Sequence, residues 1–454
     1  MIADDRFARF TDHREGAATM ADILIASLGP LGHIGPLLTV AQGLVNRGDR
    51  VTVLTAARHA PAIRGVGATP VALPVEADLD ETTLDAENPG RAETSGIRRV
   101  NFDIVRFFVA PMAHQDRALA KLLTQKHFDA VIADYGFFGI LPFVLGDRAG
   151  RPPILAYSTT PLMLTSRDTA PSGLGLAPSS TRLGRLRNRA LNTLTQRVLL
   201  REAQRAANKQ LDRLNAPPLP CFILDVGMLC DRLIAPTVTE FDYPRSDLPD
   251  TVRYVGAVHP APTRDFRPPP WWPQLDLDRP VVHVTQGTVD NADLSRLLEP
   301  TIEALGDEDV TVVATTGGRD VGLLKMPLPA NTFVAEYVPH DVLLPKVDVM
   351  VTNGGYGAVQ RALSCGVPLV VAGDTEDKPE VAARVARAGA GINLRTGTPS
   401  PGALRNAVRA VLNDDRYLDG ARNLESAFAR RDGVAEIAAL VDEVIAERGR
   451  VVTR

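Results

Sequence analysis

The sequence predicts an α/β protein of two doubly wound domains, each with a parallel sheet covered by helices. Three observations support this prediction. The length of 454 residues suits two domains. Short apolar runs alternate with segments of helical spacing from residue 21 onward, which is typical of βαβ units. A proline-rich stretch at 260–280 interrupts this alternation, which resumes after it.

The first half contains four strand candidates, each a short apolar run. Between them lie segments with apolar residues at helical spacing, such as 33–49, where Gly48 stops the pattern. The region 182–215 is rich in arginine and is expected to form two solvated amphipathic helices. The strand candidates are residues 21–29, 50–56, 128–136 and 152–159.

The second half contains six further strand candidates with helical segments between them, followed by a helical pattern at 420–447. The strand candidates are residues 280–287, 310–317, 332–338, 348–355, 368–373 and 389–395. The predicted division is a disordered extension at 1–20, a first domain at 21–255, a linker at 256–280, a second domain at 281–420, and a C-terminal helix at 421–454 that crosses back to the first domain.

The composition excludes several classes of protein. A net charge of −4 gives no field that would attract nucleic acid. The first twenty residues lack the apolar core of a signal peptide, and no apolar run approaches the length of about 18 residues that indicates a membrane span. Cys221, Cys230 and Cys365 form no CxxC pair, so we expect neither a disulfide framework nor a zinc site, and we expect a cytoplasmic location.

The stretch VTNGGYGAVQRALSCGVPLVV at 351–371 indicates an anion-binding turn. It has the pattern of a strand, a glycine-rich turn, a helix and a second strand, with Gly354, Gly355 and Gly357 where the helix begins. A helix N-terminus presents unpaired N–H groups and positive potential. Glycines leave room for a ligand to approach the backbone, so we expect a pyrophosphate here.

This turn belongs to a longer pattern that resembles the donor-binding signature of family 1 glycosyltransferases, the UDP-glycosyltransferase-like group. The likeness is greatest to bacterial members that glycosylate macrolides and other natural products. The family pattern HGGxGTxxEALxxGVP is matched in large part from Gly354 to Pro368, and its later aspartate is matched by Asp377. The resemblance covers about residues 21–445. It implies the GT-B architecture, with two Rossmann-like domains facing across a cleft, the donor held by the second and the acceptor by the first.

Four positions depart from that pattern. Asn353 replaces the usual histidine, Ala358 the Ser/Thr, Arg361 the glutamate that holds the ribose hydroxyls in the family, and Lys378 the glutamine after the aspartate. Glycine supplies backbone N–H groups regardless of these changes, so they affect recognition of the ribose and sugar rather than of the diphosphate. Gln360, beside Arg361, is a candidate to replace the glutamate.

Other segments complete the donor site that the resemblance implies. The turn at 286–288 is similar to one whose polar atoms lie near the phosphates, and Tyr337 occupies the position of an aromatic that stacks on the base. Asp377 and Lys378 occupy the positions of a pair that binds the donor sugar. The predicted donor-site residues are Gln286, Gly287, Thr288, Tyr337, Val338, Asn353, Gly354, Gly355, Gly357, Ala358, Gln360, Asp377 and Lys378.

The segment SLGPLGHIGPLL places His33 where the first long helix begins. A sugar transfer to a hydroxyl needs a base, and histidine suits that task near neutral pH. The GHxxP pattern resembles the family segment that carries the catalytic histidine. The family also has an aspartate at the end of a later strand that orients this histidine, and Asp134 occupies that position.

The resemblance thus implies an inverting transfer of a hexose from a UDP- or TDP-linked sugar, without a metal or bound cofactor. The acceptor would be a hydroxyl of a small, mostly apolar natural product, such as a macrolide or polyphenol. The loops at 75–110, 135–145 and 158–180 are expected to hold it. The acceptor candidates are Phe102, Phe107, Phe108, Phe137, Phe138 and Met163.

Three alternatives remain open at this point. The arginines at 182–213 favour a lipid glycosyltransferase acting at a membrane surface. The departures in the donor turn suggest a non-catalytic partner of another glycosyltransferase, which the presence of His33, Asp134 and Asp377 opposes. A sugar-nucleotide epimerase would need carboxylate acid/base groups, and GHIGP argues against it. We expect a monomer or homodimer with small-molecule ligands, no nucleic acid, and at most peripheral contact with a membrane.

Overall fold

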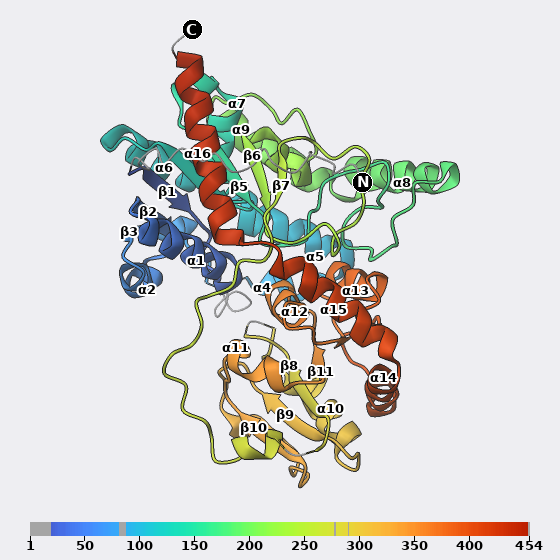
Figure 1. Ribbon diagram of the computed structural model, residues 1–454. Coiled ribbons are helices and arrows are strands. Elements are labelled where there is room, and N and C mark those ends of the chain that lie inside the picture. The colour runs from blue at the N-terminus through green and yellow to red at the C-terminus, as the bar shows by residue number, and fades with distance from the viewer. Residues whose placement is uncertain (1–19, 81–87, 277, 289, 453–454) are drawn as a thin grey trace, which may run out of the picture.

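The computed structural model describes residues 20–80, 88–276, 278–288 and 290–452, so the predicted extension lies outside it apart from Met20. It contains a seven-stranded sheet in the order β3-β2-β1-β4-β5-β6-β7 and a six-stranded sheet in the order β10-β9-β8-β11-β12-β13. Each strand pairing in both sheets is parallel. The predicted fold class, with two doubly wound α/β domains, is therefore confirmed, and the two sheets occupy separate halves of the molecule (Figure 1).

The first half carries the acceptor-side elements of the predicted architecture. Its strands are β1 Asp22–Ala26, β2 Arg50–Thr55, β3 Thr69–Ala72, β4 Ala130–Asp134, β5 Ile154–Tyr157, β6 Arg232–Ala235 and β7 Val252–Tyr254. Its α-helices are α1 Leu31–Arg47, α2 Ala60–Gly65, α4 Pro89–Ala92, α5 Gly96–Asp103, α6 Met112–Gln125, α7 Leu141–Leu145, α8 Arg182–Leu194 and α9 Arg201–Arg213. The short strands β3, β6 and β7 were not among the predicted strands.

The second half contains the elements of the predicted donor side. Its strands are β8 Val281–Thr285, β9 Thr311–Thr315, β10 Thr332–Ala335, β11 Val349–Thr352, β12 Leu369–Val371 and β13 Gly391–Asn393. Its α-helices are α10 Leu298–Leu305, α11 His340–Leu343, α12 Tyr356–Leu363, α13 Lys378–Arg387, α14 Pro401–Asn413 and α15 Asp415–Ala429, and α16 Gly433–Val452 ends the described chain.

Helices cover both faces of the first sheet. Because successive residues of a strand point to opposite sides, each strand contributes side chains to both covered faces. In β1, Ile23 and Ile25 pack in a cluster with residues of α1, whereas Leu24 and Ala26 join a second cluster with residues of α6 and α9. All five residues of β1 are buried, which explains its continuous apolar run. The alternation of strands and helices in the sequence is thus the direct consequence of two covered faces.

Each sheet has one point where the strand order reverses, which is where ligands bind in open parallel sheets. In the first sheet β1 is flanked by β2 and β4, and in the second β8 is flanked by β9 and β11. The turns that follow β1, β4, β8 and β11 therefore meet at the carboxyl edges of the two sheets.

The end of the chain is divided between the two halves. Leu424 and Phe428 of α15 pack in the core of the second half. After α15 the chain crosses, and Ile437 and Val441 of α16 join the cluster that contains α1. Arg47 fixes this contact, since its Nη1 donates to the Ala438 carbonyl (3.0 Å) and to Asp442 Oδ2 (2.9 Å). In the described ranges, no helix is long and apolar enough to cross a bilayer.

Candidate active site

His33 and Asp134 form a hydrogen-bonded pair at the carboxyl edge of the first sheet. His33 lies in the first turn of α1, and Asp134 is the last residue of the neighbouring strand β4. The distance from His33 Nδ1 to Asp134 Oδ2 is 2.7 Å. The other carboxylate oxygen, Oδ1, accepts a bond from Gly136 N at 2.8 Å, which fixes the carboxylate. The sheet topology therefore brings together two residues that are far apart in the sequence.

This pairing sets the chemistry of the imidazole. A carboxylate can only accept hydrogen bonds, so Nδ1 carries the proton and Nε2 is left as the basic atom. Burial disfavours the charged ring, but the charge and hydrogen bond of Asp134 outweigh it, so the pKa of His33 is raised. The His33 side chain keeps 23 % of its surface exposed whereas Asp134 has none, so the imidazole can be reached by a substrate.

The glycine-rich turn lies at the carboxyl edge of the second sheet, where β11 ends and α12 begins. Gly354 has a φ of +90°, and a Cβ there would lie 2.8 Å from Val371 Cγ1, so the fold itself requires this glycine. A Cβ on Gly357 would meet nothing within 4 Å. Packing within the chain therefore does not require Gly357.

Asn353 and Gln286 join the ends of β11 and β8. Asn353 Nδ2 donates to the Gln286 carbonyl at 2.6 Å. The Gln286 amide is itself engaged inside the protein, because Oε1 accepts from Leu298 N (3.0 Å) and Nε2 donates to the Asp293 carbonyl (2.9 Å). The predicted contact of the Gln286 side chain with the donor is corrected on this ground: the amide caps α10. In the same predicted turn, Gly287 is half-buried and Thr288 is exposed.

The residues predicted to bind the nucleobase and the ribose of the donor differ in their solvent accessibility. Tyr337 is 64 % exposed, as a stacking platform must be, while Val338 beside it is buried. Gln360 is buried on α12, and its Oε1 has no hydrogen-bond partner in the part of the chain that the structure describes. An unpaired buried acceptor is costly, and a ligand hydroxyl would satisfy it. Ala358 is partly buried and packs against the core of the second half.

Arg361 of α12 supplies a positive charge to its surroundings. Burial and then the charge of Arg361 lower the pKa of His340 to about 4, and the same two causes lower the pKa of His259 to about 4. Both imidazoles are therefore neutral at pH 7. Where the family pattern places a glutamate, this chain thus has a positive charge.

Asp377 and Lys378 lie where α13 begins. Burial raises the pKa of Asp377 to about 6, against the opposing charge of Lys378. Lys378 Nζ donates to Thr375 Oγ1 (3.0 Å) and forms ion pairs with Glu376 and with Asp290 (3.4 Å). The prediction that Lys378 binds the sugar directly is therefore corrected, because its ammonium group holds the loop together.

Asp290 is a site residue that the sequence reasoning missed. It follows β8, and its Oδ2 accepts a bond from Thr375 Oγ1 at 3.0 Å, so it links the β8 turn to the 374–378 loop. The sequence signal that could have identified Asp290 is a carboxylate that follows a strand end near the predicted phosphate turn. The charges of Asp377 and Glu376 also contribute to the raised pKa of His33.

Glu380 of α13 connects the second half to the acceptor-side loop of the first. Its Oε1 accepts hydrogen bonds from Gly173 N (2.9 Å) and Gly175 N (2.8 Å). Its Oε2 pairs with Arg384 at 2.8 Å, and Arg384 also pairs with Asp242 at 3.0 Å. This buried network begins three residues after Asp377, so it fixes the donor loop and the 158–180 loop against each other.

The predicted acceptor residues are mostly in the core. Phe107, Phe137 and Phe138 are buried, so the prediction that they line an acceptor wall is corrected: they pack inside the first half. Met163 is partly buried against the same core, and Phe102 contacts Phe107 edge-on, with the ring centroids 6.3 Å apart.

Phe108 is the predicted aromatic that borders the base. It is partly buried, and its ring centroid lies 6.4 Å from that of His33 and 6.1 Å from that of Phe138. In the described ranges, no group of three or more His, Cys, Asp or Glu side chains is placed to hold a metal ion.

Comparison with known proteins identifies the class to which this arrangement belongs. Residues 299–444 match the family described as Erythromycin biosynthesis protein CIII-like, C-terminal domain. The 4'-demethylrebeccamycin synthase of Lentzea aerocolonigenes is 43% identical over 427 residues, which cover 94% of this chain and 100% of that protein. UDP-glycosyltransferase 2 of Phaeomoniella chlamydospora is 34% identical over 93% of this chain and 96% of its own length.

The solved structure of the glycotransferase of kitacinnamycin has the same fold, with a TM-score of 0.73 at 21% identity, covering 94% of this chain and 99% of that one. Two Rossmann-like domains with these motifs define a nucleotide-sugar-dependent glycosyltransferase of GT-B architecture. The chain belongs to the family 1 glycosyltransferases, as the resemblance in its sequence implied.

Proposed function

We propose that this enzyme transfers a hexose from a UDP- or TDP-linked sugar to a hydroxyl of a small, mostly apolar natural product, with inversion at the anomeric carbon. One observation carries the proposal: His33 Nδ1 lies 2.7 Å from the buried carboxylate of Asp134, which leaves Nε2 as the basic atom of a partly exposed imidazole. Direct transfer needs a base for the acceptor and a group that orients the donor sugar on opposite sides of the reacting atoms.

The first step is removal of the acceptor proton. His33 Nε2 takes the proton from the acceptor hydroxyl while Asp134 accepts the hydrogen bond from Nδ1 and stabilises the imidazolium that forms. The acceptor oxygen then bonds to the anomeric carbon as the bond from that carbon to the diphosphate breaks. Attack occurs from the face opposite the diphosphate, so the configuration inverts.

The leaving diphosphate is stabilised by the N-terminus of α12. Gly355 and Gly357 leave the backbone accessible there, and the helix dipole favours the developing negative charge. Tyr337 offers its exposed ring to the nucleobase. Gln360 offers its unpaired amide oxygen to a ribose hydroxyl. Asp377 accepts hydrogen bonds from hydroxyls of the sugar. These roles remain part of the proposal, as does the division into an acceptor domain at 21–255 and a donor domain at 281–420.

The acceptor class is proposed from the chemistry of the site and from a relative. The printed name of 4'-demethylrebeccamycin synthase supports a natural product as the acceptor. Phe108 beside His33 supports an apolar or aromatic one. The three cysteines are free thiols, which suits the cytoplasm as the proposed location, and a monomer or homodimer remains our proposal for the oligomeric state.

The test combines donor binding with product analysis. Thermal unfolding in the presence of UDP- and TDP-sugars should identify the donor, because a ligand that binds the folded state raises the melting temperature. The selected donor is then incubated with a panel of aromatic and macrolide alcohols, and NMR coupling constants of the product give the anomeric configuration. An inverted glycoside supports the proposal. A retained configuration, or donor turnover that yields only hydrolysis with every alcohol, would contradict it.

A further inference from the structure

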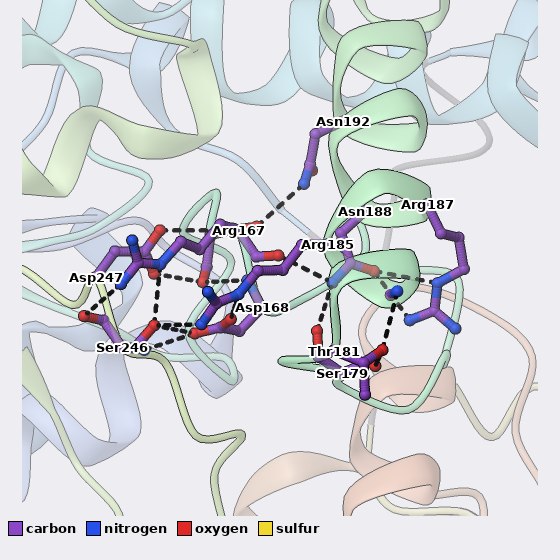
Figure 2. Close-up of polar contacts among 12 residues, drawn as sticks. Arg167, Asp168, Ser179, Thr181, Arg185, Arg187, Asn188, Asn192, Ser246 and Asp247 are labelled. Carbon is purple, nitrogen blue, oxygen red and sulfur yellow. Dashed lines mark hydrogen bonds and ion pairs between the residues drawn. The ribbon is translucent and has the colours of Figure 1, made fainter.

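The chain forms an arm of α8, the π-helical turn Thr195–Leu199 and α9, and the side of α8 that faces the protein is polar. Asn188 and Asn192 are both buried there. Asn188 Nδ2 donates to the Arg167 carbonyl at 3.1 Å, and Asn192 Nδ2 donates to the Thr169 carbonyl at 3.1 Å (Figure 2). The first part of this arm is therefore held to the body by amide hydrogen bonds rather than by an apolar face.

Further polar contacts anchor the same helix. Asp168 pairs with Arg185 Nε at 2.8 Å and accepts a bond from Ser246 N at 2.8 Å, as Figure 2 shows. The Thr181 hydroxyl caps the helix by accepting from Gly184 N at 3.1 Å. The orientation of α8 is thus fixed, and with it the identity of the residues that point outward.

The outward side of α8 and of the π-helical turn carries exposed apolar residues. Leu183 is 81 % exposed, Leu186 64 %, Leu194 46 % and Val198 62 %. Their spacing of three, eight and four residues places them along one side of a helix, with Ala190 between them. A helix on a protein surface normally turns such a stripe toward the core. In α8 the apolar stripe faces outward instead, and the polar side faces the protein. Figure 1 shows α8 at the right-hand edge of the view, away from the second sheet.

The same arm carries a strong positive charge. Residues 182–213 contain nine Lys and Arg against two acidic residues, in a chain whose net charge is −4. Arg182, Arg189 and Arg197 are exposed and have no ion pair with any residue in the described part of the chain. An open groove beside the stripe is lined by further arginines, among them Arg167 and Arg185. The positive charge is therefore available to an external partner.

We propose that this arm binds the surface of an anionic membrane. A helix that combines an exposed apolar stripe with arginines lies in the plane of the interface, with leucines at the boundary between headgroups and acyl chains. Long arginine side chains extend along apolar surface while their heads reach lipid phosphates. Because the charge and the apolar stripe extend along the same helix, they match an extended negative plane better than a localised acidic patch on a protein.

This binding would place the membrane beside the acceptor side of the enzyme. Residues 165–181 lead directly into α8, and Gly173 and Gly175 of that segment bond to Glu380. An apolar acceptor that partitions into the bilayer would thereby be concentrated near the loop that faces the donor. The inference about membrane binding itself stands apart from the proposed function, because it rests only on the arm.

The experiment is vesicle co-sedimentation of the full chain. We expect it to pellet with vesicles of phosphatidylcholine and phosphatidylglycerol and not with phosphatidylcholine alone, and to be released by added salt, which screens exposed charges. Each neutralised arginine should weaken binding roughly fivefold, so Arg182→Gln with Arg189→Gln should weaken it about 25-fold. Leu183→Asp with Leu186→Asp should abolish it.

Matched controls separate the arm from the rest of the surface. Leu323→Asp changes a leucine that is 48 % exposed in the second half, and Arg264→Gln changes an exposed arginine of the linker. Both should leave vesicle binding unchanged. Thermal unfolding and donor binding of every variant should match those of the wild type. Lack of binding to the anionic vesicles at low salt would overturn the proposal, as would equal effects of the control variants. A dimer in gel filtration that Leu186→Asp converts to a monomer, without vesicle binding, would assign the stripe to a second copy instead.

Discussion

His33 Nδ1 lies 2.7 Å from Asp134 Oδ2, and the carboxylate is fully buried while the imidazole is not. The pair depends on the first sheet, because β1 and β4 are neighbours and their carboxyl ends lie side by side. Asp134 holds the ring in the tautomer whose Nε2 is free to accept a proton.

Replacement of Asp134 by asparagine should impair catalysis without removing the donor site. The amide keeps the size of the carboxylate but cannot stabilise an imidazolium, and its NH₂ group favours the wrong tautomer of His33. We expect kcat to fall by roughly 10⁴-fold, as for the equivalent change in a serine protease triad. Isothermal titration should give an unchanged donor Kd. The exposed Asp212→Asn is the control, and a loss of less than tenfold in kcat would argue against the role of Asp134.

The activity should depend on pH through His33. The base must be neutral, and its pKa is raised above the usual 6.5, so kcat/KM should increase as the pH rises through that higher value. In Asp134→Asn the stabilising charge is gone while burial remains, so the acid limb should move to lower pH. A pH–rate profile of each enzyme with saturating donor measures this shift. An acid limb that stays in place in the variant would contradict the assignment.

Gly354 and Gly357 should respond differently to alanine. Gly354→Ala forces a side chain into a φ of +90° and against Val371, so the free energy of unfolding should fall by about 1–3 kcal/mol. Gly357→Ala meets no atom within 4 Å and lies in a helix, so stability should stay equal or rise by up to about 1 kcal/mol.

Gly357→Ala should weaken donor binding even though it does not weaken the fold. The methyl group of Gly357→Ala occupies the open approach to the N-terminus of α12, so donor Kd should increase although the protein is stable. Urea denaturation and donor titration of the same preparations measure both effects. Unchanged donor affinity in Gly357→Ala would show that the diphosphate does not lie against this turn.

Glu380→Ala should destabilise the protein and weaken acceptor binding. It leaves Gly173 N and Gly175 N without their acceptor and removes one partner of the buried Arg384, which costs about 3–5 kcal/mol for a buried pair. The freed 158–180 loop should raise the KM for acceptor more than that for donor. Glu436→Ala, which removes an ion pair to Arg431 on the surface, is the control and should cost less than about 1 kcal/mol. Equal stability of the two variants would contradict the role given to Glu380.

The sequence was sufficient to predict the two doubly wound domains because continuous apolar strands and helical spacing are local properties. Strand β1 is buried on both faces and therefore reads as an unbroken apolar run. The strands β3 and β7 form the edges of the first sheet and are only partly buried, so they lack the continuous apolar run of β1, and β6 is a run of four residues that begins with Arg232. The pairing of His33 with Asp134 was expected from the resemblance to the family, since a contact between distant residues is created only by the topology.

The details of the donor site were less predictable because they depend on which partner each side chain finds. Gln286 is polar and precedes the turn, but its amide caps α10. Lys378 occupies the position of a sugar-binding residue, but Glu376 and Asp290 hold its ammonium group. Phe137 and Phe138 follow a strand end, as loop residues of a binding wall would, and yet both are buried in the core. None of these outcomes is encoded in local spacing.

The most direct test of the central claim is the transfer rate of His33→Ala, measured together with its donor affinity. Removal of the imidazole deletes the base and leaves α12, Tyr337 and Asp377 in place. We predict an unchanged donor Kd and no detectable transfer to a hydroxyl acceptor, together with a lower melting temperature because the buried Asp134 loses its partner; His114→Ala should behave as the wild type. Transfer by His33→Ala at close to the wild-type rate would contradict the assignment of His33 as the catalytic base.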